Sequence, residues 1–393
     1  MQQPSHVIDA NGEVIFSLPR TVPPFAPWPQ EHIVNPKPES GPGTTVNGFP
    51  NNEDSPGPEP KRDGSETVCY TVQVSAKHLA LASPVLRKCL TGPWKESQSL
   101  VKDGPVKLNA GDWDLEAFLL FMNIIHCRTH KLTRNISVNR LAQLATIVDY
   151  YDCVPAVKFF ADIWIGTLTP AFPTVHCPMT KSFPTVHCRE VMLWLCISCI
   201  FNHQTWFRKA AHLAITQSNE PLTSLGLPLP TTLLCESLLQ GSFLPANTAA
   251  AEINRRRTEK ISEVFAALDK EHQAYSNALT GCSFECRSMM LGALTLQRQD
   301  NKLFSPRASV APHHGTNYKA LVQAVGSFKN PAWSLPPKKD VYGRVITSEA
   351  SPSQHDCAGS TFEHLKDIIR GNDDTIDMNI TDYTSHPVSE GHD

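Results

Sequence analysis

The stretch that decides the fold is residues 70–86, which read YTVQVSAKHLALASPVL. Val72 and Val74 alternate with polar residues, and this two-residue period is typical of a strand with one buried face. From Leu79 onward the apolar residues recur at three- and four-residue spacing, which is the period of a helix. The stretch therefore predicts a strand that runs directly into a pair of short helices.

Elements on either side extend this unit. A turn-prone Asn11-Gly12 precedes the β-branched and aromatic run at 14–16, which predicts a strand. After residue 90 we expect a short strand at 106–108, and then helices at 112–126, 138–151 and 155–168, the first of them capped by Asp112. Strands followed by helices are typical of an α+β domain. We predict one such domain, a small β-sheet flanked by helices, over residues 6–169.

A stretch of different composition separates the first two strands. Residues 21–66 are dense in proline, set among glycine, serine, asparagine and glutamate. Such a segment cannot bury enough apolar surface to offset the entropy lost on ordering. We interpret it as a disordered insertion between neighbouring strands at 13–19 and 67–74. Closing so long a loop costs on the order of 3 kcal/mol, and each doubling adds only about 0.6 kcal/mol, so the fold tolerates it.

The second half of the chain predicts a helical domain and a tail. Helical periodicity covers 190–201, 206–217, 249–279 and 284–297. We therefore expect a linker at 170–189, a helical domain at 190–330 and a mostly disordered tail at 331–393, where periodicity is lost and aspartates gather.

Composition excludes several functional classes. The 35 basic and 38 acidic side chains leave a formal charge of -3, so nucleic acid is not the expected ligand. The longest apolar run, at 191–201, is about half of the ~20 residues that a membrane-spanning helix needs. No secretory signal opens the chain, so the 12 cysteines are interpreted as reduced thiols. We predict a soluble protein of the cytoplasm or nucleus.

The strand-to-helix stretch resembles a known family. Residues 72–86 resemble the signature of BTB/POZ domains at Val74, His78, Leu79, Ser83 and Pro84. The sequel RKCLTGPWKES at 87–97, which contains Trp94, is similar to the version found in a large group of uncharacterised fungal BTB proteins. The chain departs mildly from the family pattern at two places. The family usually has Phe at the position of Leu86, and it usually has an acidic turn where this chain has Asn11-Gly12. Further similarity to that group lies at 113–126, 144–151, 160–164, 193–198 and 281–286, so it reaches from about residue 6 to about residue 310.

The resemblance implies a scaffold. BTB/POZ domains bind proteins, self-associate, and in some cases bridge substrates to cullin-type ubiquitin ligases, so it implies no catalytic residue. The candidate contacts are Trp94, Trp113 and Glu116, on the helix at 112–126 and the loop around Trp94. We interpret His78 as a hydrogen-bonded packing histidine, because no nucleophile or carboxylate partner is evident.

The alternative hypothesis is a zinc-stabilised regulatory protein. The hexapeptide FPTVHC occurs at 172–177 and again at 183–188, so His176, Cys177, His187 and Cys188 offer four ligands. Copying of a short gene tract explains the repeat without function, and adjacent ligands in an extended segment point to opposite faces.

A second set of possible zinc ligands is formed by two cysteine pairs, Cys196 with Cys199 and Cys282 with Cys286. The first pair lies in a run of apolar residues without Gly or Pro, so a buried helix face is the better interpretation. We predict no metal ligand, no cofactor-binding residue and no small-molecule substrate.

The remaining charged cluster is Arg255-Arg256-Arg257. Glu252, Glu259 and Glu263 flank it at helical spacing, which favours an exposed helix with many ion pairs over a nuclear import signal. No Walker, GxGxxG, GxSxG or HExxH motif occurs, so no motif supports an enzymatic function. An unrecognised hydrolase would need an activated nucleophile, and the sequence does not reveal one.

Overall fold

The computed structural model divides the chain into two compact units. The first comprises Met1–Ile136 and Gln143–Trp164, and the second comprises Ser137–Ala142 and Ile165–Asp393. The residues that the structure describes are 3–28, 69–91, 105–169, 183–229, 252–304, 309–335, 339–344, 353–355, 359, 361–371 and 378–380.

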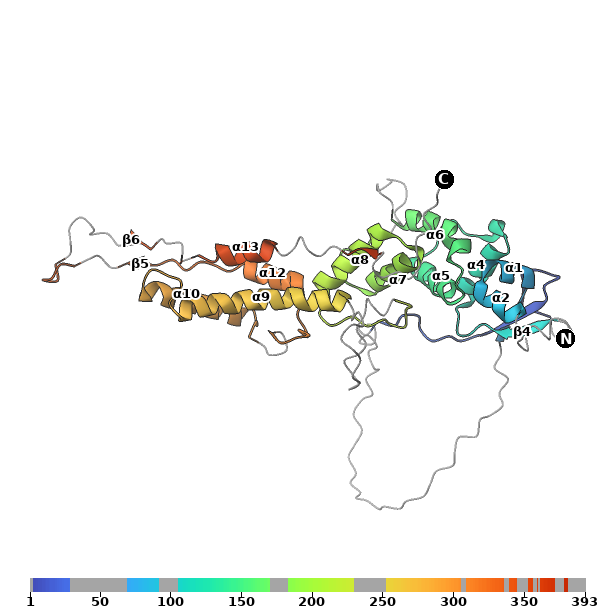
Figure 1. The fold of residues 1–393 in the computed structure, drawn as a ribbon, viewed down its shortest axis with the longest axis horizontal. Helices are drawn as coiled ribbons and strands as arrows, with labels where there is room; N and C mark the ends of the chain where they lie inside the picture. The colour runs from blue at the N-terminus through green and yellow to red at the C-terminus, as the bar shows by residue number, and fades with distance from the viewer. Residues whose placement is uncertain are drawn as a thin grey trace, which may run out of the picture. The chain divides into compact units, whose positions relative to one another are not determined.

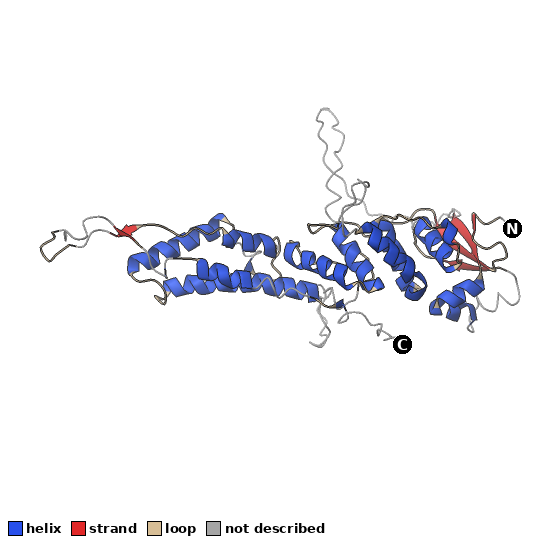
Figure 2. Ribbon diagram, turned by 90° about the horizontal axis from the view of Figure 1, so that it is seen from above, coloured by secondary structure: helices blue, strands red, loops and turns tan. Residues whose placement is uncertain are grey.

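A four-stranded mixed sheet forms one side of the first unit (Figure 2). Its strands are β1 (His6–Val7), β2 (Val14–Pro19), β3 (Cys69–Val74) and β4 (Val106–Asn109), in the order β1-β3-β2-β4. β2 and β3 pair antiparallel, whereas β1 with β3 and β2 with β4 pair parallel. The strands that flank the proline-rich stretch are therefore neighbours in one sheet, as the sequence predicts.

The predicted insertion at 21–66 is described only in part. Residues 21–28 are described, and Ala26 is 4% exposed, so the packed chain continues beyond β2 at least to this point. The predicted disorder of residues 29–66 lies outside the described residues.

Helices cover one face of the sheet because β2 and β3 bury alternate residues (Figure 1). The helices of this part of the chain are α1 (Ala76–Ala82), α2 (Pro84–Thr91), α4 (Leu115–Ile125), η2 (Thr129–Lys131), α5 (Val138–Tyr150) and α6 (Val154–Leu168). Phe118 of α4 packs edge-to-face on Phe16 of β2, with 5.2 Å between ring centroids. The predicted cap, Asp112, is wrong: Asp114 accepts from the Ala117 amide at 3.0 Å, because the helix begins two residues later. The α+β class is confirmed.

The second unit is mainly helical. Its helices are α7 (Arg189–Phe201), α8 (Gln204–Gln217), α9 (Glu252–Ser276), α10 (Phe284–Asp300), α12 (Tyr318–Gly326) and α13 (Glu363–Gly371). α9 and α10 form a long hairpin, and α8, α12 and α13 pack against α9 (Figure 1). A two-stranded sheet pairs β5 (Ser334–Leu335) with β6 (Ser353–Gln354). None of the described helices is both long and apolar enough to span a membrane.

α13 departs from the predicted disordered tail. Phe362, Leu365 and Ile369 are at most 2% exposed, and their spacing of three and four residues forms one apolar stripe that packs on α9. This helix is hard to predict from the sequence because it is short and lies close to an acidic segment.

Candidate functional site

The family-signature residues build the corner between the sheet and the first two helices. Val74 and Leu79 are fully buried. Ser83 is also buried; its hydroxyl donates to the Tyr151 carbonyl at 2.5 Å and accepts from the Leu86 amide at 3.0 Å. Pro84 begins α2, where a missing N–H costs nothing. Trp94 lies outside the described residues.

His78 stacks on a second histidine that the sequence analysis did not identify. The rings of His78 and His126 lie 4.8 Å apart at an interplanar angle of 24°. His126 Nε2 accepts from the Ser75 amide at 3.0 Å, so Nδ1 carries the proton that is donated to the Met122 carbonyl at 2.9 Å. His78 packs as predicted, but the predicted hydrogen bond is not seen at Nδ1, which is buried without a partner among the described residues.

The first unit should therefore lose stability in mild acid. Burial lowers the pKa of His126 below its ordinary value of 6.5, and His78 adds to this effect, whereas Asp9 opposes it. Because the folded pKa is the lower one, the unfolded chain binds the proton first as pH falls below 6.5. Stability is then full above that pH and is lost as pH falls below it, towards the folded pKa.

Hydrogen exchange of β2 and β3 between pH 7.5 and pH 5.5, corrected for the intrinsic rate, measures this effect. In His126→Gln, which keeps a side-chain amide near Ser75, we expect a lower stability at neutral pH and a flatter pH dependence. An equally steep dependence in this variant would contradict the assignment of the effect to His126.

An aromatic patch lies where the chain enters α4. Trp113 is half-buried, and its ring packs edge-to-face with Tyr150 of α5 at 5.4 Å. Tyr150 is 62% exposed and also packs on Tyr151 at 4.9 Å. Glu116 is exposed at the start of α4. We define Trp113, Glu116 and Tyr150 as the aromatic patch; sequence analysis identified its first two members.

Most of α4 is buried, so less of the predicted contact surface is accessible than expected. Ala117, Phe118, Phe121, Met122, Ile124 and Ile125 are buried in the first unit. The side chains that remain available on the predicted surface at 112–126 therefore lie mainly in its first turn.

A second apolar pair is exposed on α6. Phe159 is 69% and Ile163 is 48% exposed, while Val157, Ala161 and Trp164 bury the opposite side of the helix. Residues four apart share a helix face, so the two exposed side chains are neighbours. The sequence does not reveal this pair, because apolar residues occupy most of the circumference of α6 apart from Lys158 and Asp162, and such a pattern does not show which apolar residues stay exposed.

Only the second copy of the FPTVHC repeat is described. Its Phe183 stacks on Trp206 with 5.2 Å between ring centroids, and it also contacts Trp194 at 5.5 Å. Burial lowers the pKa of His187 to about 4, with a further contribution from the charge of Arg257. The copy at 183–188 therefore packs against α7 and α8. His176 and Cys177 lie outside the described residues.

The predicted alternative of a four-cysteine site is wrong. Cys196 and Cys199 are buried in α7, as the interpretation of a buried helix face predicts, and neither belongs to the group of possible metal ligands among the described residues. Among the described residues, the one group of three or more His, Cys, Asp or Glu side chains that could hold a metal ion is Cys282, Cys286 and His355. The second cysteine pair thus meets a histidine that sequence analysis did not consider.

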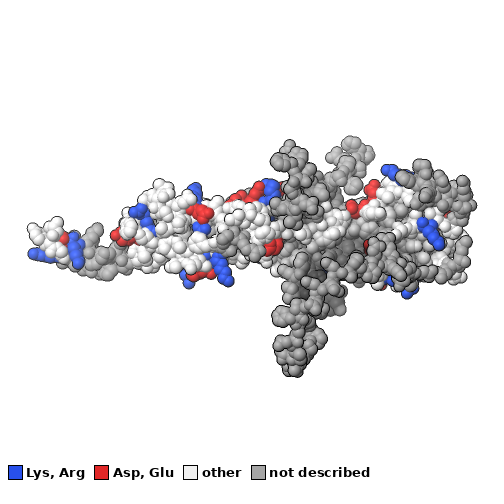
Figure 3. Space-filling view, turned by 90° about the horizontal axis from the view of Figure 1, so that it is seen from below, with Lys and Arg blue, Asp and Glu red and all other residues white. Residues whose placement is uncertain are grey.

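The arginine cluster divides into two kinds of environment. Arg255 pairs with Glu252 and Glu259, and Arg256 donates to Glu252 at 2.6 Å, as predicted for an exposed helix. The prediction of an exposed, ion-paired side chain is wrong for Arg257, which is fully buried and donates to backbone carbonyls. On the face shown in Figure 3, basic and acidic side chains are interspersed over the described residues.

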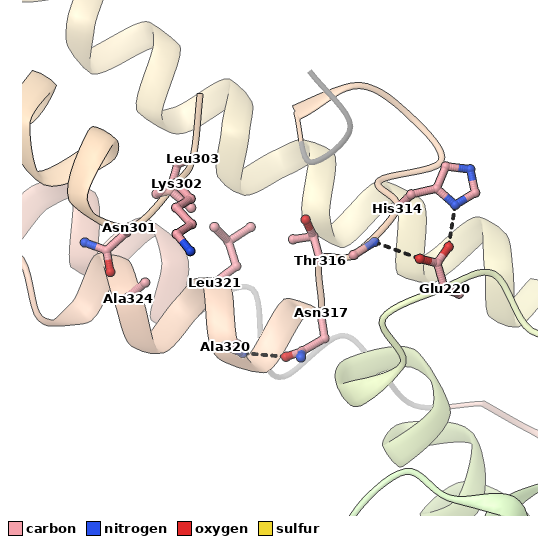
Figure 4. Close-up of a pocket in the computed structure, with 11 residues that line it drawn as sticks. Glu220, Asn301, Lys302, Leu303, His314, Thr316, Asn317, Ala320, Leu321 and Ala324 are labelled. Atoms are coloured by element: carbon pink, nitrogen blue, oxygen red, sulfur yellow. Dashed lines mark hydrogen bonds and ion pairs between the residues drawn. The ribbon is translucent and has the colours of Figure 1, made fainter. Parts of the chain in front are cut away.

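A cleft of about 510 Å³ lies beside α12 (Figure 4). Glu220 accepts from the Gly315 amide at 3.1 Å and pairs with His314 at one end. Asn317 Oδ1 accepts from the Ala320 amide at 2.7 Å and so caps α12. Because these polar groups serve the local structure, the cleft carries no assignment of a ligand.

Comparisons with protein-family models, with curated proteins and with solved structures found no match to this chain.

Proposed function

We propose that the chain is a non-enzymatic protein-interaction scaffold whose first unit binds a second copy of the same chain. One observation carries this proposal: Tyr150 leaves 62% of its surface exposed while its ring packs on Trp113. The two rings come from different elements of the fold, so the position of the exposed ring is determined by packing and not by one side chain alone.

The aromatic patch has the chemistry that protein interfaces use. Tyrosine and tryptophan offer large apolar areas with few rotatable bonds, and each keeps one polar atom for a hydrogen bond. Both are enriched at the centres of interfaces, whereas charged residues are more frequent at the rim. Glu116, which is exposed in the first turn of α4, supplies such a charge three residues after Trp113.

The resemblance to BTB/POZ domains supports the same proposal. These domains self-associate, and some connect substrates to cullin-type ubiquitin ligases, so a ligase subunit is the second partner to test. In this proposal the signature residues stabilise the part of the fold that carries Tyr150. The Ser83 hydroxyl donates a hydrogen bond to the carbonyl of Tyr151, the residue next to Tyr150.

Truncation of the exposed ring should weaken self-association. For Tyr150→Ala we expect the dissociation constant to rise at least about tenfold, because removal of a central interface tyrosine costs upward of about 1.4 kcal/mol. Sedimentation velocity over a concentration series measures the change. The matched control is Tyr342→Ala, since Tyr342 is 82% exposed in the second unit and should leave association unchanged.

Two results would contradict the proposal. One is a wild-type chain that stays monomeric throughout the series. The other is an unchanged dissociation constant in a Tyr150→Ala protein whose circular dichroism matches that of the wild type.

A further inference from the structure

We propose that Cys282, Cys286 and His355 bind a zinc ion that fastens the segment after β6 to the turn between α9 and α10. One ligand atom from each of the three side chains lies within 4.8 Å of the other two. The inference is independent of the proposed self-association, because all three residues belong to the second unit.

The two cysteines are positioned by the start of α10. Gly281 has a φ of +93°, a region that glycine adopts without strain, and it turns the chain directly before Cys282. Ser283 caps the helix by accepting from the Cys286 amide at 3.2 Å, which places Cys286 in the first turn. A helix N-terminus favours the thiolate over the thiol, and the thiolate is the form that binds metal.

His355 reaches the same place from a distant part of the sequence. β5 and β6 pair antiparallel, and the His355 amide donates to the Trp333 carbonyl at 2.9 Å. The Trp333 and His355 rings stack at 4.3 Å and 18°, which fixes the orientation of the imidazole. Its Nε2 then faces Cys282 Sγ at 3.5 Å, across a sequence separation of 73 residues.

Two glycines bring these segments into close contact. A Cβ on Gly359 would lie 2.7 Å from the Gly281 nitrogen and 2.9 Å from its Cα. A Cβ on Gly281 would meet Arg287 Cγ at 2.6 Å and Cys286 Sγ at 3.5 Å. The backbone that follows His355 therefore packs directly on the backbone that precedes Cys282.

The distance between Cys282 and His355 matches the edge of a zinc tetrahedron. Zn–S bonds of about 2.3 Å and Zn–N bonds of about 2.05 Å at a tetrahedral angle place sulfur and nitrogen about 3.6 Å apart. The observed Cys282–His355 distance is 3.5 Å. Two sulfurs around such an ion lie about 3.8 Å apart, which is compatible with the 4.8 Å that bounds every separation in the cluster.

Ligand chemistry selects zinc among the common metals. Thiolate and imidazole are poor ligands for Mg²⁺ and Ca²⁺, which take oxygen, whereas two thiolates and one imidazole are a usual set for Zn²⁺. Zinc takes four ligands, so three protein ligands leave one position for a water molecule.

A thiol beside an imidazole is also the arrangement of a cysteine nucleophile. Such a nucleophile needs one thiol, and this cluster has two. Cys286 is fully buried, which suits a ligand held between two segments better than a group that attacks a substrate. We therefore assign the cluster to metal binding.

Metal analysis of the full-length protein, purified without chelators, tests the proposal. We expect about one zinc per chain in the wild type, and a loss of most of it in Cys282→Ser and in His355→Ala. Cys282 is exposed, so its substitution should not disturb folding. The matched control is Cys188→Ser in the hexapeptide repeat, which should retain the metal. Replacement of zinc by Co²⁺ should produce the visible absorption of a tetrahedral thiolate site in the wild type and in Cys188→Ser. The same treatment should not produce it in Cys282→Ser or His355→Ala.

Alkylation provides a readout that does not depend on the folding of the variants. In the wild type, iodoacetamide should label Cys282 slowly, and a strong chelator should accelerate the labelling at least about tenfold. The proposal is overturned by a folded wild type that binds no zinc, by zinc retained in Cys282→Ser, or by zinc lost in Cys188→Ser. It is also overturned by rapid labelling that a chelator does not change, which would indicate a reactive thiol instead.

Discussion

Replacement of Arg257 by methionine should destabilise the second unit by about 4 kcal/mol, because it removes a buried cation that serves several backbone acceptors at once. Arg257 is fully buried, and burial lowers its pKa to about 10, so the guanidinium is charged at neutral pH. Its N–H groups donate at 2.7–3.1 Å to the carbonyls of Ser218, Asn219, Pro312, His313 and Thr316.

These carbonyls come from two segments, the end of α8 and the loop before α12. Arg257, on α9, thus holds three parts of the second unit together. Methionine fits a similar volume but donates no hydrogen bond, so the buried carbonyls would lose their donor. Urea denaturation, together with hydrogen exchange of α9, measures the loss.

The neighbouring arginine provides the control. Arg256 is partly exposed and pairs with Glu252, so Arg256→Met should cost at most about 1 kcal/mol. Equal effects of the two substitutions would show that the carbonyl contacts of Arg257 contribute little.

Replacement of Gly12 by alanine should destabilise the first unit by about 3 kcal/mol through a backbone clash. A Cβ at this position would lie 2.4 Å from the carbonyl oxygen of Val74 and 2.5 Å from the carbonyl carbon of the same residue. Val74 pairs with Val14 in the central pair of strands, so relief of the clash would have to move β2 away from β3. Thermal denaturation should show the loss as a lower midpoint for the first unit.

Gly166 is the matched control for this glycine. It lies in α6, and a Cβ there would meet no atom within 4 Å. Because alanine favours a helix over glycine by roughly 0.5–1 kcal/mol, Gly166→Ala should stabilise the protein slightly. A Gly12→Ala protein as stable as the wild type would contradict the close approach of residue 12 to β3.

The strand-to-helix corner was predictable because its signals are local. Alternating Val72 and Val74, followed by helical spacing from Leu79, lie within a few residues of one another, and the structure has β3, α1 and α2 there. The same holds for the strand pair around the proline-rich stretch, since each strand carries its own pattern. What the sequence could not reveal is that the packed chain continues beyond β2 to Ala26, which depends on tertiary contact.

The candidate sites were less predictable because they join distant residues. Arg257 follows two arginines that do form the predicted ion pairs, and only the carbonyls brought in from 218–219 and 312–316 distinguish it. His355 lies in a segment without periodicity, 73 residues from Cys282, so the spacing of the cysteines suggested partners in α7 instead. Tyr150 was included in a predicted helix, but the direction of its ring is determined by Trp113, from another element.

Site-specific photo-crosslinking is the sharpest test of whether the aromatic patch contacts a second copy of the chain. A photo-reactive phenylalanine analogue in place of Tyr150 keeps an aromatic ring at the proposed interface, and the same analogue in place of Tyr342 is the control. On irradiation of the full-length protein, we expect a covalent species of twice the chain mass from position 150, with crosslinked peptides from the first unit, and none from position 342. A crosslinked dimer from position 342 but not from position 150 would contradict the account.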